Sequence, residues 1–279
     1  MVGGGCGPSA TAPATAAQRS GAAAVTNHDG NLSPLKPRAP GADAVPLSRT
    51  PELQPPSHAA AASWTTTLLS LVRHRFGLKF VGVSGFMWLF FAAYFHLLRN
   101  PLRPVTEMPL TALDHWVNFQ PGALAAYVSL WLYVGIPAGL MPSLRHLVAY
   151  GLWVGSLCLA GLAFFYVFPT AVPLPLLPVD VALHPGFALL QGVDAAGNAC
   201  PSLHVATAVF SALWIDHLLR RLGAPHWPRA LNAAWVLLIV YSTLAIKQHV
   251  AIDAVAGSAL ALLFAWPSMR WFPALAPPT

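Results

Sequence analysis

Six long apolar segments dominate the chain after its first quarter and restrict the folds open to it. A helix needs about 20 mostly apolar residues to cross the hydrocarbon core of a membrane, and about 17 are still sufficient. Segments of this kind are residues 80–98, 122–141, 147–168, 201–219, 230–246 and 250–266. Only 9% of the residues are charged, against about 25% in ordinary soluble domains. We therefore predict an all-α, polytopic integral membrane helical bundle with about six transmembrane helices.

The remaining segments suggest three parts. Residues 1–62 are rich in Ala, Pro and Gly and contain almost no large apolar residues, which predicts a disordered tail. Residues 63–79 combine apolar and basic side chains, which is typical of an amphipathic helix at a membrane surface. Residues 80–279 form the expected transmembrane domain. Within it, residues 174–190 are apolar but interrupted by three prolines and an aspartate, so we expect a loop packed near the interface.

The distribution of positive charge predicts an orientation, because Lys and Arg near the ends of spans are retained on the cytoplasmic side. The expected inner side holds Arg73, Arg75, Lys79, Arg145, Arg220, Arg221, Arg229 and Arg270. The expected outer side holds only Arg99, Arg103 and Lys247. We thus predict a multi-pass protein of the cytoplasmic (inner) membrane with both termini in the cytoplasm. Residues 99–121, 169–200 and 247–249 would form loops on the outer, periplasmic side.

Charge and cysteine content exclude several classes of function. The formal net charge of +6 is spread out with no basic run, so we expect no nucleic-acid partner. The three cysteines are too few and too scattered for a disulfide framework or a zinc site. The sequence contains no signal for an oligomeric state.

The fourth apolar segment opens with the residues PSLH, at 201–204. Pro201 suits the first position of a helix, and a helix N-terminus offers unpaired amides and a positive dipole end to a phosphate. Ser202 and His204 would then lie beside any anion bound there. The alternative is a serine cap with a histidine at the membrane interface.

A second cluster follows on the same predicted side, where the chain reads STLAIKQHVAID from residue 242. His249 and Asp253 are four residues apart, so they would share one helical face. A carboxylate can hold one imidazole nitrogen and leave the other free as a nucleophile. Ionisable residues within membrane spans indicate function, although the pair could also be a structural contact at the start of a helix.

Together these two clusters resemble the sequence motifs of a known enzyme superfamily. PSLH and S-T-x5-H-x3-D resemble the second and third signature motifs, PSGH and SRxxxxxHxxxD, of the type 2 phosphatidic acid phosphatase and haloperoxidase superfamily. The stretches at 113–137, 168–175, 197–206 and 242–257 are similar to a bacterial subgroup related to inositol phosphorylceramide synthases. The resemblance implies an integral membrane lipid-phosphate phosphatase or phosphotransferase that forms a phosphohistidine and needs no metal or cofactor. Its partners would be the bilayer and a lipid phosphate or phospholipid substrate.

The resemblance also implies a role for each matching residue. His249 would be the nucleophile, Asp253 would orient it, and His204 would be the general acid. Ser202 and nearby amides would hold the phosphoryl oxygens, which is the stabilisation that phosphoryl transfer depends on.

The chain departs from the family pattern at its cations. The positively charged positions of the first motif, KxxxxxxRP, fall on Val167 and Leu174, and the Arg of the third motif is Thr243. Lys247 is the candidate replacement for binding the substrate phosphate, although a lysine at an interface can simply extend to water. Fewer cations would favour a singly charged phosphodiester, and therefore a phospholipid head-group transferase resembling inositol phosphorylceramide synthase.

Two other classes remain as alternatives. The missing first motif would suit a non-catalytic membrane scaffold or transporter that kept the fold, although retention of His204, His249 and Asp253 argues against it. A vanadate-dependent haloperoxidase is disfavoured because those relatives are soluble.

Overall fold

The computed structural model describes residues 63–173 and 197–273. This part of the chain is mostly helical, and five of its helical segments are long and apolar enough to cross a membrane. They are α2 (Phe76–Arg99), the segment Pro121–Gly139, α7 (Leu144–Val167), α10 (His226–Ala245) and α11 (Ala251–Arg270). The prediction of a polytopic helical bundle is confirmed at this level.

The fourth expected span forms a helix, α9 (Leu203–Arg221), but it is not among these five. The mean hydropathy of α9 is lowered by one polar residue in its first turn and four towards its C-terminal end: His204, Asp216, His217, Arg220 and Arg221. The helix packs against α7, α10 and α11, and Phe210 and Trp214 are fully buried. Because its side chains contact protein, α9 does not need the apolarity of a helix that faces lipid.

The second expected span, 122–141, is broken into short helical pieces. These are η1 (Pro121–Ala123), α4 (Leu124–Val128), α5 (Leu130–Tyr133) and α6 (Gly135–Gly139). Ser129 Oγ donates to Ala126 O at 2.6 Å, a side-chain bond that bends helices. Pro137 has no N–H for the helical ladder.

The single interfacial helix expected over 63–79 is instead two elements. Helix α1 covers Trp64–Arg73, and Arg75 takes a left-handed conformation with φ 52° before α2 begins at Phe76. Lys79 therefore belongs to α2, where it is buried and donates to Leu71 O at 2.6 Å and Gly139 O at 2.7 Å. These bonds hold α1 and the end of α6 against α2.

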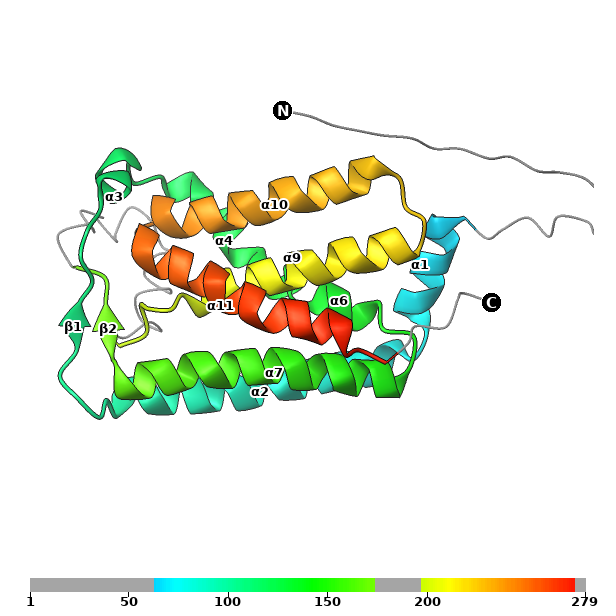
Figure 1. Cartoon of the computed structure of the whole chain (residues 1–279), viewed down its shortest axis with the longest axis horizontal. Coiled ribbons are helices and arrows are strands. Elements are labelled where there is room, and N and C mark those ends of the chain that lie inside the picture. The colour runs from blue at the N-terminus through cyan, green and yellow to red at the C-terminus, as the bar shows by residue number, and fades with distance from the viewer. Residues whose placement is uncertain (1–62, 174–196, 274–279) are drawn as a thin grey trace, which may run out of the picture. The chain divides into compact units, whose positions relative to one another are not determined.

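Within residues 63–173 and 197–273, the all-α prediction is supplemented by two short strands. Strand β1 (Thr106–Glu107) pairs in parallel with β2 (Thr170–Ala171), with Thr106 opposite Thr170. Thr170 also forms a parallel bridge with Asn198. Figure 1 shows both strands and α3 (Ala112–Trp116) at one end of the bundle, with α1 at the other end. The strands tie together the loops that precede α3, follow α7 and precede α9.

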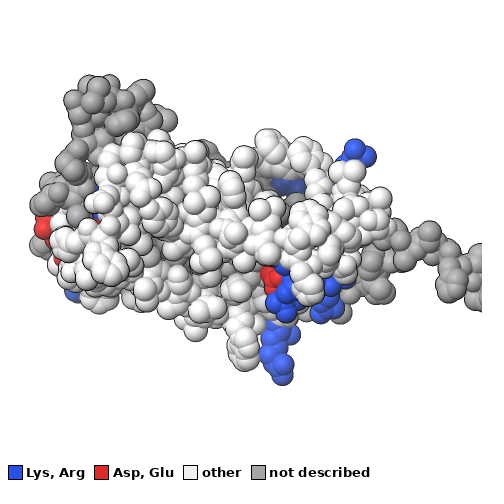
Figure 2. Space-filling view, turned by 90° about the horizontal axis from the view of Figure 1, so that it is seen from above, with Lys and Arg blue, Asp and Glu red and all other residues white. Residues whose placement is uncertain are grey.

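Charged side chains gather at the two ends. In Figure 2, uncharged side chains cover the surface between a charged region near each end. Four arginines in the first or last turn of a helix lie at the end near α1: Arg73, Arg145, Arg221 and Arg270. The end near α3 receives Arg99 and Lys247. An uncharged belt of this kind fits a multi-pass membrane protein.

The core lies where α7, α9 and α11 meet. Trp214 Nε1 donates to Ser268 Oγ at 3.0 Å, which links α9 to α11. At the other end of this pair, Gly257 lies so close to the start of α9 that an added Cβ would be 2.3 Å from Ser202 O. The absence of a side chain at Gly257 lets the two helices that carry the predicted catalytic residues approach each other.

Candidate active site

The loop between α10 and α11 places His249 just before the first turn of α11. The carbonyl of Thr243 accepts hydrogen bonds from Gln248 N and His249 N, both at 3.1 Å. Lys247 completes the turn with φ 59°. These bonds end α10 and fix the backbone of His249.

Asp253 holds the imidazole of His249. The Nδ1 atom of His249 lies 2.9 Å from Asp253 Oδ2, and Asp253 Oδ1 accepts from Val250 N at 2.7 Å. Asp253 is fully buried. A carboxylate at this position accepts from Nδ1–H, which places the lone pair of His249 on Nε2. The contact crosses the start of α11, since His249 precedes the helix instead of sharing a helical face with Asp253.

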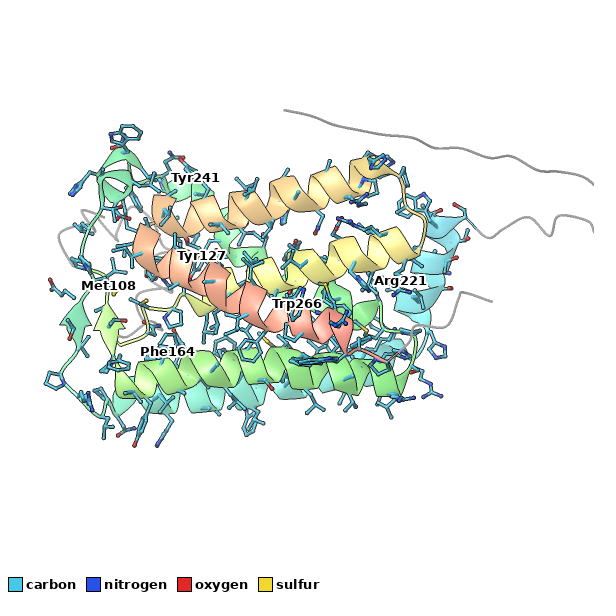
Figure 3. All side chains as sticks on the ribbon, viewed as in Figure 1. Met108, Tyr127, Phe164, Arg221, Tyr241 and Trp266 are labelled. Carbon is cyan, nitrogen blue, oxygen red and sulfur yellow. The ribbon has the colours of Figure 1, made fainter. Side chains whose placement is uncertain are left out.

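His204 lies in the first turn of α9, against an aromatic wall. Its ring stacks on Tyr127 with 3.9 Å between ring centroids and 14° between planes, and Trp131 approaches it edge-on at 6.4 Å. Figure 3 shows Tyr127 among the helices, towards the end opposite Arg221. The Nε2 atom of His204 is buried and has no hydrogen-bond partner among the described residues. A buried ring nitrogen without a hydrogen bond costs free energy. Such a nitrogen is expected in an active site, where an atom of the substrate forms the missing hydrogen bond.

His204 and His249 line the same cavity, which has a volume of about 400 Å³ and lies among α2, Pro121–Gly139, α7 and the start of α9. Tyr94 and Asn198 also line it, and Asn198 Nδ2 donates to Tyr94 OH. We call Tyr94, Asn198, His204 and His249 the polar end of this central cavity. No Lys or Arg is among the described residues that line it.

Ser202 is fully buried and caps α9. Its Oγ accepts from Val205 N at 3.2 Å, and its N–H donates to Asp253 O at 3.0 Å. Helix α9 therefore starts at Leu203, and Pro201 precedes the cap instead of occupying the first helical position. Ser202 does not line the central cavity; it joins the helix of His204 to the helix of Asp253.

Lys247 is directed to α3. Its Nζ donates to Asp114 O at 2.8 Å and to Val117 O, and the side chain is buried. Burial lowers the pKa of Lys247, while the charge of Asp114 acts to raise it. Lys247 does not line the central cavity.

Asp114 is a site residue that the motif analysis did not identify. It is buried, its Oδ1 accepts from Ala251 N at 2.7 Å, and its Oδ2 accepts from Thr111 N and Oγ1, both at 2.7 Å. Asp114 and Lys247 thus bind α3 to both sides of His249, at residues 247 and 251. The pattern T-x-x-D at 111–114 indicates the helix cap, but no spacing in the sequence links residue 114 to residue 251.

At two positions where the family motifs have a cation, this chain has the uncharged residues Val167 and Thr243. Val167 is the last residue of α7, and the Thr243 hydroxyl donates to Val240 O at 2.8 Å. Leu174 and the loop expected at 174–190 lie outside the described residues.

The comparison with protein families supports the motif analysis. A family model described as PAP2 superfamily matches residues 111–266, a stretch that contains His204, His249, Asp253 and Asp114. No curated protein and no solved structure matches the chain. Because the match covers more than half of the chain and includes both motifs, the protein belongs to the PAP2 superfamily.

Proposed function

We propose that this protein is an integral membrane enzyme that cleaves lipid phosphate esters through a phosphohistidine on His249. Membership of the superfamily suggests a phosphoric ester hydrolase or phosphotransferase. The observation that carries the finer proposal is the arrangement of two histidines on one cavity. His249 is oriented by Asp253 at 2.9 Å, and His204 offers a buried Nε2 with no partner among the described residues.

In the first step, the lone pair on His249 Nε2 attacks phosphorus, and the bond between phosphorus and the leaving oxygen breaks. His204, protonated on Nε2, gives that proton to the leaving oxygen. The Nδ1–H of His249 donates to Asp253, whose charge stabilises the imidazole as it becomes positive.

In the second step, the hydroxyl of water or of an alcohol attacks phosphorus and the P–N bond breaks. The acceptor's proton passes to His204, which restores the starting state. Phosphatase and transferase thus share one site and differ in the acceptor.

Ser202 and Lys247 are the proposed residues for holding the phosphoryl oxygens, with the first amides of α9. Neither side chain lines the central cavity, so this proposal requires both to turn towards His249 when the lipid binds. Two of the three donors on the Lys247 ammonium are used by α3 carbonyls, which leaves one N–H for a phosphate oxygen. We further propose that the end near α3 faces the outer side of the membrane. The excess of Lys and Arg at the opposite end supports this orientation.

A second candidate is a head-group transferase that acts on a phosphodiester, resembling the inositol phosphorylceramide synthases. The supporting observation is that no Lys or Arg lines the described part of the central cavity. A phosphate monoester carries nearly two negative charges at neutral pH, whereas a diester carries one, so a site with few cations disfavours the monoester more.

Product analysis with the purified protein in detergent tests these proposals. The substrates are phosphatidic acid, a prenyl pyrophosphate, phosphatidylglycerol and phosphatidylinositol, the last two with an added lipid alcohol. His249→Ala is the test variant. His226→Ala is the matched control, because His226 begins α10 at the opposite end and is exposed.

Free phosphate that requires His249 would support the phosphatase. New phosphodiester lipid without phosphate release would support the transferase. If wild type and His249→Ala gave no product from any substrate, the catalytic proposal would be wrong and the non-catalytic scaffold or transporter would be favoured.

A further inference from the structure

The central cavity extends far beyond the two histidines. On α2, its lining residues run from Leu78 to Phe95, which is about 25 Å at 1.5 Å per residue. On α7, they run from Leu144 to Phe165. This depth approaches the ~30 Å thickness of the hydrocarbon core, and far exceeds what a phosphate and its head group need.

The lining changes character along this depth. The polar end holds Tyr94, Asn198 and both histidines, whereas the opposite end is formed by apolar side chains, glycines and Tyr150. We call Leu78, Gly82, Leu144, Leu147 and Gly151 the far end of the cavity. Gly82 lies about 18 Å along α2 from Tyr94, at 1.5 Å per residue. A molecule that fills the cavity must therefore be polar at one end and a long hydrocarbon beyond it.

Two glycines leave the far end open. Gly82 and Gly151 line the cavity, and a Cβ added at either would meet nothing within 4 Å. Close helix packing does not explain these glycines, in contrast to Gly257, where an added Cβ would strike backbone. Because both glycines also line the cavity, a larger side chain at either position has room and would lie next to a chain bound there.

We propose that the central cavity binds the hydrocarbon chain of the lipid substrate, and that the far end at Gly82 and Gly151 sets the longest chain that fits. The inference rests on the proposed function, since it takes the phosphate to lie at His249. Lipid tails are as apolar as leucine side chains, so the chain gains little from leaving the bilayer and its fit to the cavity decides selectivity.

The test compares chain-length profiles of variants that fill the far end. Gly82→Leu and Gly151→Leu are the test variants. Gly85→Leu is the matched control, because Gly85 also lies on α2 with nothing within 4 Å but does not line the cavity. The substrates are lysophosphatidic acids with octanoyl, lauroyl, palmitoyl and oleoyl chains in one detergent. Phosphate release gives kcat/KM for each chain.

One methylene group in a fitted pocket changes kcat/KM by about tenfold or more. We therefore expect both test variants to lower the ratio of palmitoyl to octanoyl kcat/KM at least about tenfold. The control should keep the wild-type ratio. Unchanged ratios in both test variants would overturn the proposal.

A second readout does not need turnover. An alkyl phosphonate with a diazirine at the end of its chain is cross-linked to the protein, and the labelled residues are identified by mass spectrometry. A palmityl-length probe should label α2 and α7 near Gly82 and Gly151, and excess lysophosphatidic acid should prevent the labelling. Labelling there in a protein that forms neither free phosphate nor a new phosphodiester lipid would contradict the proposed function alone. Labelling that competitor lipid leaves unchanged would mean that bulk lipid fills the cavity, and would overturn the inference.

Discussion

Helices α2 and α9 are both expected from the sequence as membrane spans, yet they have opposite surroundings. In α9, 11 of its 19 residues are buried in protein. In α2, only Lys79 and Leu98 of its 24 residues are buried. Helix α2 is long and apolar enough to cross a membrane but has few protein contacts, whereas α9 is not among the apolar spans and lies at the centre of the bundle. Between these two helices, the one with few protein contacts is the more apolar, as expected of a helix that faces lipid, and the buried helix carries polar groups that chemistry can use.

The largest expected effect is catalytic, and it lies in the buried interior that α9 shares with α11. We expect Asp253→Asn to lower kcat/KM by about a thousandfold, because an amide no longer fixes the tautomer of His249. The measurement is product formation by protein that elutes as one species in size-exclusion chromatography. Asp216→Asn, the same change near the opposite end of α9 at a half-buried ion pair, should retain activity within a few fold. Equal losses in both variants would contradict the assignment.

Truncating one phenylalanine in each helix tests the packing difference directly. Phe210 is fully buried in α9, whereas Phe80 in α2 is 62% exposed. Phe210→Ala should lower the free energy of unfolding by about 3–5 kcal/mol, while Phe80→Ala should change it by less than about 0.5 kcal/mol. Thermal melts in detergent measure both. A large loss at Phe80 would show that α2 contacts protein on that face.

Glycine replacements compare α2 with the close contact between α9 and α11. Gly257→Ala would place Cβ 2.3 Å from Ser202 O, so α9 and α11 must separate, and we expect a loss of about 1–3 kcal/mol. Gly85→Ala meets nothing within 4 Å and should be neutral or slightly stabilising. Thermal midpoints and activity should fall together only for Gly257→Ala; unaffected activity there would mean that the close approach of these helices is dispensable.

The smallest expected effect concerns the bonds from α3 to the loop of His249. Asp114→Asn and Lys247→Met each remove charge from this contact, and we expect kcat to fall about tenfold for Asp114→Asn, since one misplaced group loses alignment. If Lys247 also holds phosphate, Lys247→Met should raise KM as well as lower kcat, and Lys247→Arg should recover part of both. An unchanged KM for Lys247→Met would restrict Lys247 to positioning.

The sequence is sufficient to predict most of the long helices and the contact between His249 and Asp253. The physical reasons for these two predictions differ. Long apolar segments can satisfy their backbone in lipid only as helices, so residues 80–98 and 147–168 were placed within a few residues of α2 and α7. The spacing of His249 and Asp253 is local, and local spacing predicted their contact. The predicted loop at 247–249 also places His249 before α11, but the expected shared helical face is wrong, because α11 begins only at Ala251, where Asp253 accepts from Val250 N.

Contacts between distant residues could not be predicted in the same way. The bond from Asp114 to Ala251 joins residues 137 positions apart, and polarity alone assigns an aspartate near a loop to solvent. The sequence makes Lys247 a candidate for binding the substrate phosphate, but its contact with α3 carbonyls depends on how α3 folds over the loop. The breaks within Pro121–Gly139 likewise arise from Ser129 and Pro137 in a segment whose composition reads as one helix.

The most direct test of the central claim is to trap the covalent intermediate. Purified protein is mixed with lipid carrying a radiolabelled phosphate and quenched in alkali within the first turnover, and the labelled peptide is identified by mass spectrometry. We predict an acid-labile, alkali-stable phosphoryl group on His249 that is absent from His249→Ala and accumulates in His204→Ala when the leaving group is activated. Turnover of the lipid with no label on His249, or with label on another residue, would contradict the proposed mechanism.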